Sequence, residues 1–470
     1  MNFVTRFSAA GTLLLASSLA APAHAGNIGI SEFDSTSSGR GFSTIAVADS
    51  PSAIIYNPAN ITRLPGLQLN FGMAAMMPRW EYVPLDDQTV GTKSETAVST
   101  PPSFSLTYNL GNPGGIGDIA AGLGFYVPWG SSFSWPAEWA GRQSVQKITL
   151  QIFEVSPVLA WRPHPMVAVG AGLRVMPGNV YLKQAVDFGT EAGGTVEMAG
   201  SGTGMGASAG IGVWPLDGLS LGFSWRSAGT VKMTGQSDFD FPAPFDTKAN
   251  DRDVETEVPV AQMFRAGVAY DVLPKKLNVS AAFMYQMWST FKELAVTFID
   301  ADGNREVLAQ PRNAKNSVSL HLGGEYRLSD SVAVRAGYVY DQKVLPEDTV
   351  NPAPPNSDLH LATVGASYYM GQYGVHAHFE NVFYAPRESK TSSFPAKWQG
   401  GWAGGTMAYV FGLNVSAAFG AAPEAAAAPA PEETSAVDSA PAADVSPATV
   451  ETLPASTPEE AAPATTLPTP

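Results

Sequence analysis

Three side chains that could bind a metal ion or act as a base alternate near the end of the sequence: His376, His378 and Glu380. In an extended chain, alternate residues point to the same face, so the two imidazoles and the carboxylate would lie side by side. The chain has no His-Glu-x-x-His segment and no cysteine to accompany them. We therefore interpret them as polar side chains that pair with one another on the inner face of the fold. We expect neither an enzyme nor a metal site nor a cofactor.

The elements that would present these side chains are β-strands, because polarity alternates with a period of two along most of residues 67–419. In one example, Leu277, Val279 and Phe283 share one face, while Asn278 and Gln286 share the other. About fourteen such segments begin near Leu67, Pro102, Asp118, Lys147, Pro165, Thr203, Gly218, Glu257, Lys275, Asn316, Asp330, Asp358, Gln372 and Ala403. This even number predicts an all-β fold, a 14-stranded antiparallel transmembrane β-barrel. The alternative is a soluble multistranded sandwich.

The first 25 residues have the features of a secretory signal peptide. Arg6 precedes an apolar stretch that ends in Ala23, His24 and Ala25, a small-residue cleavage pattern. No later stretch reaches the roughly 18 apolar residues that a spanning helix needs. The absence of cysteine excludes a disulfide scaffold, and no basic patch indicates nucleic acid. These features favour a barrel in the bacterial outer membrane.

The connections between the segments predict an orientation. Short turns alternate with long loops, of which residues 232–258 and 344–357 are examples, as periplasmic turns alternate with extracellular loops in such barrels. Most tryptophans lie near segment ends and would form an interfacial aromatic girdle; they are Trp129, Trp135, Trp139, Trp161, Trp214, Trp225, Trp288, Trp398 and Trp402.

Residues 421–470 are rich in Ala, Pro and Glu and contain no Lys or Arg, which predicts a disordered periplasmic tail.

If the faces rich in Leu, Val and Phe point to lipid, the opposite faces line the lumen. The ionisable residues expected there are Arg174, Arg226, Arg265, His321, Glu325, Arg327, Arg335, Asp341, His376, His378 and Glu380. Most of them would pair with one another.

The region after the signal peptide resembles a known family. The stretch SEFDSTSSGRGFSTIAVADSPSAIIYNPANIT, with Asn57, Pro58 and Ala59 near its end, is similar to the N-terminal hatch of the FadL family of outer-membrane long-chain fatty-acid transporters. Four further landmarks follow in order: YVPWG, WAGRQSV, VRAGYVYDQ and TVNPAPPNSDLH. The resemblance covers essentially residues 26–420.

This resemblance implies a hatch at residues 26–66 that closes the lumen of a barrel at residues 67–420. The implied function is passive uptake of long-chain fatty acids or similar hydrophobic compounds. Two alternatives remain: uptake of aromatic or alkane hydrocarbons, and a surface barrel without transport that serves as an adhesin or phage receptor. The implied partners are a hydrophobic small molecule, outer-membrane lipid or lipopolysaccharide, and the barrel assembly machinery.

By analogy with the family, ligand-binding cations are expected on the fifth strand and at its exit, which indicates Arg174 and Lys183. Arginine suits a carboxylate because its guanidinium donates two parallel hydrogen bonds. The family's third strand is inferred to open sideways to the membrane. In that strand of this chain, Gly122, Gly124 and Pro128 are the expected weak points, since glycine lacks a side chain and proline lacks a backbone donor.

Overall fold

The computed structural model of the chain describes residues 29–84, 91–95, 97–188, 193–246, 251–349, 356–389, 400–402 and 407–420. All of these residues belong to one compact unit, Met1–Glu424. The predicted signal peptide and the predicted tail lie outside the described residues.

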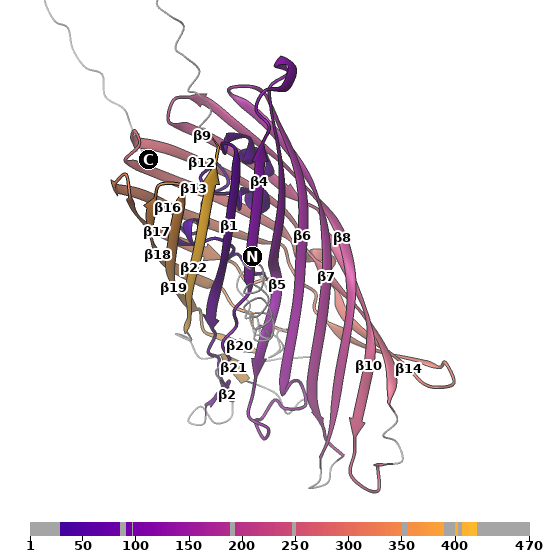
Figure 1. Cartoon of the computed structure of the whole chain (residues 1–470). Coiled ribbons are helices and arrows are strands. Elements are labelled where there is room, and N and C mark those ends of the chain that lie inside the picture. The colour runs from indigo at the N-terminus through magenta and orange to yellow at the C-terminus, as the bar shows by residue number, and fades with distance from the viewer. Residues whose placement is uncertain are drawn as a thin grey trace, which may run out of the picture. The chain divides into compact units, whose positions relative to one another are not determined.

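Fourteen antiparallel strands form a closed barrel (Figure 1). They are β1 (Leu67–Met77), β4 (Pro102–Asn109), β5 (Asp118–Ser134), β6 (Lys147–His164), β7 (Val167–Val186), β8 (Gly194–Leu216), β9 (Leu219–Arg226), β12 (Gln262–Leu273), β13 (Leu277–Met287), β16 (Ser317–Ser329), β17 (Val332–Asp341), β18 (Leu359–Met370), β19 (Tyr373–Tyr384) and β22 (Met407–Phe419). The last strand, β22, pairs with β1, so that Leu67 lies opposite Phe419 and the ring closes. This confirms the predicted all-β barrel and its strand number.

The two ends of the barrel differ in their connections. The end that contains Leu67 and Phe419 has short turns, such as the two residues between β16 and β17, and we call it the turn end. The opposite end carries the long connections, and we call it the loop end. On the outer face, alternate apolar residues such as Leu173, Met205 and Leu413 are 64%, 72% and 53% exposed, the pattern of a wall that faces lipid.

A four-stranded extension at the loop end was not expected from the sequence. Its strands are β10 (Gly229–Asp240), β11 (Arg252–Val260), β14 (Glu293–Ile299) and β15 (Arg305–Pro311). β10 pairs with the loop-end half of β8, and β11, β14 and β15 follow in order. Residues 232–240 and 252–258, which fall within a predicted long loop, are therefore parts of two paired strands. β8 begins at Gly194 rather than near Thr203 because β10 continues the sheet beyond the barrel.

The remaining strands form a small sheet of β2 (Glu81–Pro84), β3 (Thr92–Lys93), β20 (Arg387–Ser389) and β21 (Gly400–Trp402). The loop-end structures correct the prediction of an aromatic girdle. Trp135 and Trp139 stack at 4.3 Å, Trp129 and Trp288 meet edge to face at 5.5 Å, and all four are buried. They serve as core residues because the long connections fold over them, whereas Trp161 is exposed on the outer face.

The N-terminal segment, residues 29–66, lies inside the barrel and contains α1 (Ser35–Gly39), α2 (Ala53–Tyr56) and the 3-10 helix η1 (Pro58–Arg63). Its backbone lies against glycines on the inner faces of several strands. A Cβ atom at Gly323 would stand 2.0 Å from the Arg40 carbonyl, and one at Gly222 would stand 2.1 Å from the Ile45 carbonyl. Glycine is required at these positions because the two backbones approach so closely. No described helix is long and apolar enough to cross a membrane.

Candidate functional site

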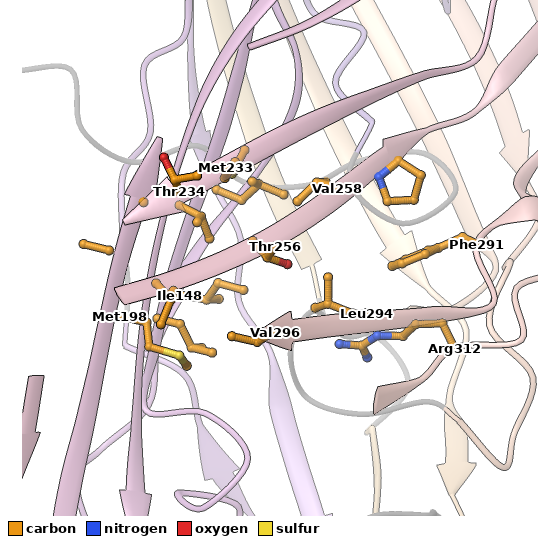
Figure 2. A pocket seen from close by; sticks show the side chains of 17 residues that line it. Ile148, Met198, Met233, Thr234, Thr256, Val258, Phe291, Leu294, Val296 and Arg312 are labelled. Carbon is orange, nitrogen blue, oxygen red and sulfur yellow. The ribbon is translucent and has the colours of Figure 1, made fainter. Parts of the chain in front are cut away.

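An apolar pocket lies at the loop end, between the barrel wall and the extension (Figure 2). We call it the outer pocket. Strands β6, β7 and β8 form one side, and β10, β11 and β14 form the other. The cavity has a volume of about 110 Å³. Its apolar walls include Ile148, Leu150, Val180, Leu182, Met198, Met233, Val254, Val258, Phe291, Leu294 and Val296.

Arg312 is the one charged residue among the seventeen that line this pocket. Its side chain lies near Leu294 and Phe291 at one edge (Figure 2). Nη2 donates to Gln310 Oε1 at 3.3 Å, and the Arg312 carbonyl accepts from Thr349 Oγ1 at 2.6 Å, which fixes the backbone. Burial lowers the pKa of Arg312 to about 10, still well above neutrality. A cation at the edge of an apolar cavity suits a ligand with an anionic head and an apolar body.

The barrel interior, by contrast, holds arginines in groups around buried carboxylates. Glu154 on β6 accepts from Arg174 Nε at 3.0 Å and from Arg226 Nη2 at 2.6 Å. These three side chains are at most 4% exposed. A buried carboxylate is tolerated because both guanidinium groups compensate its charge.

A second group joins the N-terminal segment to the wall. Glu325 on β16 accepts from Arg40 Nη2 at 2.6 Å and forms an ion pair with Arg335 of β17 at 2.7 Å. Arg40 also pairs with Asp49 of its own segment at 3.0 Å, and Arg327 reaches Glu325 at 3.2 Å. Arg40 is thereby held between two strands and its own segment.

The histidines singled out in the sequence also belong to the interior. His376 bonds to Ser367 Oγ at 2.6 Å and to Ser416 Oγ at 2.8 Å. His378 bonds through Nδ1 to Ser35 Oγ of α1 at 2.9 Å, and its Nε2 lies 3.3 Å from Glu380 Oε1. Among the described residues, no group of three His, Cys, Asp or Glu side chains could hold a metal ion. The expected inward, paired lining is thus observed at these positions.

The spacing Gly-x-Ser-x-Gly occurs at residues 206–210 and 218–222. The first lies within β8, where Ser208 is in register with Arg226 of β9, and the second crosses the start of β9. A nucleophile elbow places its serine at a sharp turn between a strand and a helix. The serines of these two segments lie in strands instead, so they do not have that geometry.

Arg174 and Lys183, the two predicted ligand-binding residues, are not brought together. Both are on β7, nine positions and therefore about 30 Å apart along the strand. An odd separation also places them on opposite faces. Arg174 points inward to Glu154, whereas Lys183 Nζ pairs with Glu197 Oε1 at 2.7 Å. One carboxylate therefore cannot reach both cations.

The predicted hatch motif, Asn57, Pro58 and Ala59, joins the N-terminal segment to β7 and β8. Asn57 Oδ1 accepts from Ala59 N at 3.2 Å, which caps η1, and Pro58 is its first residue. Asn57 Nδ2 donates to the Ile45 carbonyl at 2.9 Å and to the Ile211 carbonyl of β8 at 3.0 Å. The motif therefore has both a capping and an anchoring contact.

The predicted weak points of β5 have two different environments. The pairing of β5 with β6 shifts register between Tyr126 and Trp129, which includes Pro128. Gly122 and Gly124 lie in regular pairing with both β4 and β6. A Cβ at Gly122 would stand 2.8 Å from Ile54 Cδ1, so this glycine makes room for the N-terminal segment. Of the three predicted weak points, Pro128 is therefore the one at an irregularity in the pairing of β5.

Comparison with known proteins identifies the family. The family described as "Outer membrane protein transport protein (OMPP1/FadL/TodX)" matches residues 16–419. The chain belongs to this family. It is therefore an outer-membrane transport protein, and the family consists of transport channels rather than enzymes.

Individual relatives are distant. A 47 kDa outer membrane protein of Pasteurella multocida (strain Pm70) is 24% identical over 152 residues, which cover 32% of this chain and 33% of that protein. The crystal structure of a Pseudomonas aeruginosa FadL homologue is similar with a TM-score of 0.73 and 18% identity, over 84% of this chain and 100% of the other. The Pseudomonas putida toluene transporter TodX gives a TM-score of 0.64 and 15% identity, over 85% and 99%. These structural similarities support the barrel fold.

Arg312 was not among the residues that the sequence singled out. This residue lies in the connection between β15 and β16, outside any alternating segment. The alternation of polar and apolar residues therefore did not predict whether its side chain points inward or outward. Its place in an apolar pocket depends on strands from six different parts of the chain. The only local sequence feature is a Gln-Pro-Arg stretch after a strand, and this feature is not specific for a ligand-binding residue.

Proposed function

We propose that the protein takes up long-chain fatty acids, or similar hydrophobic acids, passively across the bacterial outer membrane. The observation that carries the proposal is the outer pocket, in which Arg312 is the one charged lining residue among apolar walls. An acyl chain would lie along the aliphatic side chains, and its carboxylate would accept hydrogen bonds from the guanidinium.

In this proposal the N-terminal segment acts as a hatch and the loop end faces the outside of the cell. A barrel of fourteen strands is too wide to be filled by its own side chains, so a separate segment must close it. The buried helices α1 and α2 and the close contacts at Gly323 and Gly222 support this role. The register shift near Pro128 is the site at which we propose that ligand leaves sideways.

A second candidate is the uptake of aromatic or alkane hydrocarbons. The similarity to a toluene transporter favours it, as do the aliphatic walls of the outer pocket. A neutral hydrocarbon gains nothing from a guanidinium, whereas a carboxylate does. The two candidates therefore differ in their dependence on Arg312.

The test is uptake of labelled oleate and labelled toluene by cells that lack other uptake proteins and produce either the wild type or Arg312→Gln. Arg305→Gln is the matched control, since Arg305 lies in the neighbouring strand β15, is about half exposed and pairs with Glu255. We expect Arg312→Gln to lower oleate uptake selectively. Uptake of toluene but not oleate by the wild type would favour the second candidate.

A further inference from the structure

Arg312 lies in a short turn that is fixed on one side by the residues before β14. Its backbone N–H donates to the Lys292 carbonyl at 2.7 Å, and Ala314 N donates to the Phe291 carbonyl at 3.0 Å. Between them, Asn313 has a φ of 45°, in the left-handed region that few residues other than glycine adopt. The side chain of Arg312 therefore leaves the backbone at a sharp bend, and its direction depends on how this bend is held.

The other side of the turn is held by Thr349, from the connection between β17 and β18. Thr349 Oγ1 donates to the Arg312 carbonyl at 2.6 Å, over a separation of 37 residues in the sequence. The two residues are 2% and 3% exposed, and a hydrogen bond shielded from water in this way is strengthened by the low local dielectric. The described residues that line the outer pocket do not include Thr349. Any effect of Thr349 on a ligand there must therefore act through Arg312.

Thr349 is itself fixed by the fold of its connection. Its backbone N–H donates to the Pro346 carbonyl at 3.2 Å, which forms a tight turn. The start of the same connection is joined to the segment of Arg312, because Lys315 N donates to the Val344 carbonyl at 2.8 Å. The two connections are thus linked at two points, of which the Thr349 hydroxyl is the one that reaches Arg312.

A buried arginine holds the base of this connection. Arg387 donates to the carbonyls of Asn356 and Leu345. Asn356 Oδ1 accepts from Val344 N and from Leu345 N, at 2.9 Å each. Asn356 belongs to the landmark TVNPAPPNSDLH, which begins at Thr349. Two residues of this landmark therefore help to fix the connection and its contact with the outer pocket's arginine.

The two parts of an amphiphilic ligand depend differently on such a contact. A guanidinium binds a carboxylate through directional, parallel hydrogen bonds, so the geometry of Arg312 matters for the head group. Apolar burial is non-directional and depends on the area removed from water. A shift of the Arg312 backbone should therefore weaken recognition of the head group and leave binding of the acyl chain to the aliphatic walls unchanged.

We propose that Thr349 is a positioning residue for the outer pocket: its hydroxyl holds the Arg312 backbone so that the guanidinium faces the carboxylate of the ligand. This inference rests on the proposed uptake of hydrophobic acids and on the role of Arg312 in it. Thr349 contacts no ligand itself. It sets the preference for an acidic over a neutral head group from outside the pocket.

The experiment is equilibrium binding of oleate and of oleyl alcohol, which has the same chain without the charge, to the purified full-length wild type and its variants. Thr349→Val keeps the branched shape and removes the hydroxyl. It should lower the affinity for oleate roughly fivefold, the effect of one hydrogen bond, and leave the affinity for oleyl alcohol unchanged. Thr349→Ser keeps the donor and should bind oleate as the wild type does.

Thr256→Val is the matched control. Thr256 lines the outer pocket, and its hydroxyl also donates to a backbone carbonyl, that of Ala295, at 2.9 Å. Its loss should change the affinities for the two ligands by the same factor. A double variant, Thr349→Val with Arg312→Gln, tests the route of the effect, because it should bind oleate no more weakly than Arg312→Gln alone. Heat-modifiable gel mobility verifies that each variant is folded.

Equal loss of both ligands in Thr349→Val would overturn the positioning role, and so would a further loss of oleate affinity in the double variant or an equal loss in Thr349→Ser. Unchanged oleate binding by Thr349→Val, with binding still weakened by Arg312→Gln, would overturn the positioning role and leave the proposed function intact. Unchanged oleate binding by Arg312→Gln would overturn both.

Discussion

The outer pocket and the interior of the barrel both combine arginine with apolar side chains, but the residues around the arginines differ. In the interior, Glu154 and Glu325 each accept from two buried arginines. In the outer pocket, the residues that line the cavity include one cation and no carboxylate. Arginines grouped around a carboxylate hold strands and the N-terminal segment together, whereas a cation at the edge of an apolar cavity is suited to a ligand.

The largest expected effect comes from removing the segment that the interior groups hold. Deletion of residues 30–62 should open a continuous aqueous channel, because the fourteen strands pair with one another without it. Conductance in planar bilayers measures this directly. Conductance at the background level of the intact protein would show that other parts of the chain close the lumen.

Removing a shared carboxylate should destabilise the interior strongly. Glu154→Gln leaves Arg174 and Arg226 buried with uncompensated charge, which costs about 3–5 kcal/mol in the free energy of unfolding. Lys183→Gln is the control, because its partner Glu197 is more than a third exposed and such pairs contribute about 0–1 kcal/mol. Denaturation in urea, followed by tryptophan fluorescence, measures both. Similar values for the two variants would contradict the distinction between buried and surface pairs.

A smaller change tests how the N-terminal segment packs against the barrel wall. Gly323→Ala places a methyl group 2.0 Å from the Arg40 carbonyl, and the clash should cost about 1–3 kcal/mol and raise conductance. The neighbouring Gly324→Ala is the matched control on the opposite face, where the nearest atom is 3.1 Å away. If both variants have the same conductance as the wild type, the N-terminal segment does not pack against β16 in this way.

The smallest effect is expected at the C-terminus. Truncation after Gly420 should leave assembly and oleate uptake unchanged, because β22 already pairs with β1 and β19 up to its last residues. The removed residues are rich in Ala and Pro and carry eight acidic groups, a composition that does not build a core. Heat-modifiable gel mobility and uptake of labelled oleate are the measurements. Loss of the compact, heat-shifted band would place an assembly signal in the tail.

The barrel was predictable from the sequence because a strand that faces lipid on one side must alternate, as residues 407–419 do. The extension was not predictable in this way, since most of β10 and β11 lies within residues 232–258, which we interpreted as a long loop. Arg174 was correctly expected to face inward, but its partner Glu154 lies on another strand and could not be assigned by periodicity. Arg312 acquires its surroundings only when three strands of the barrel and three strands of the extension meet.

The proposed uptake of hydrophobic acids depends on recognition of the acidic head group by Arg312 in the outer pocket. The most direct measurement is the equilibrium binding of oleate and of oleyl alcohol to the purified wild type and to Arg312→Gln. We predict that the substitution weakens oleate binding by about 1.5–3 kcal/mol, the contribution of a hydrogen bond to a charged group, and leaves oleyl alcohol binding unchanged. Equal affinity of wild type and variant for oleate would contradict the account.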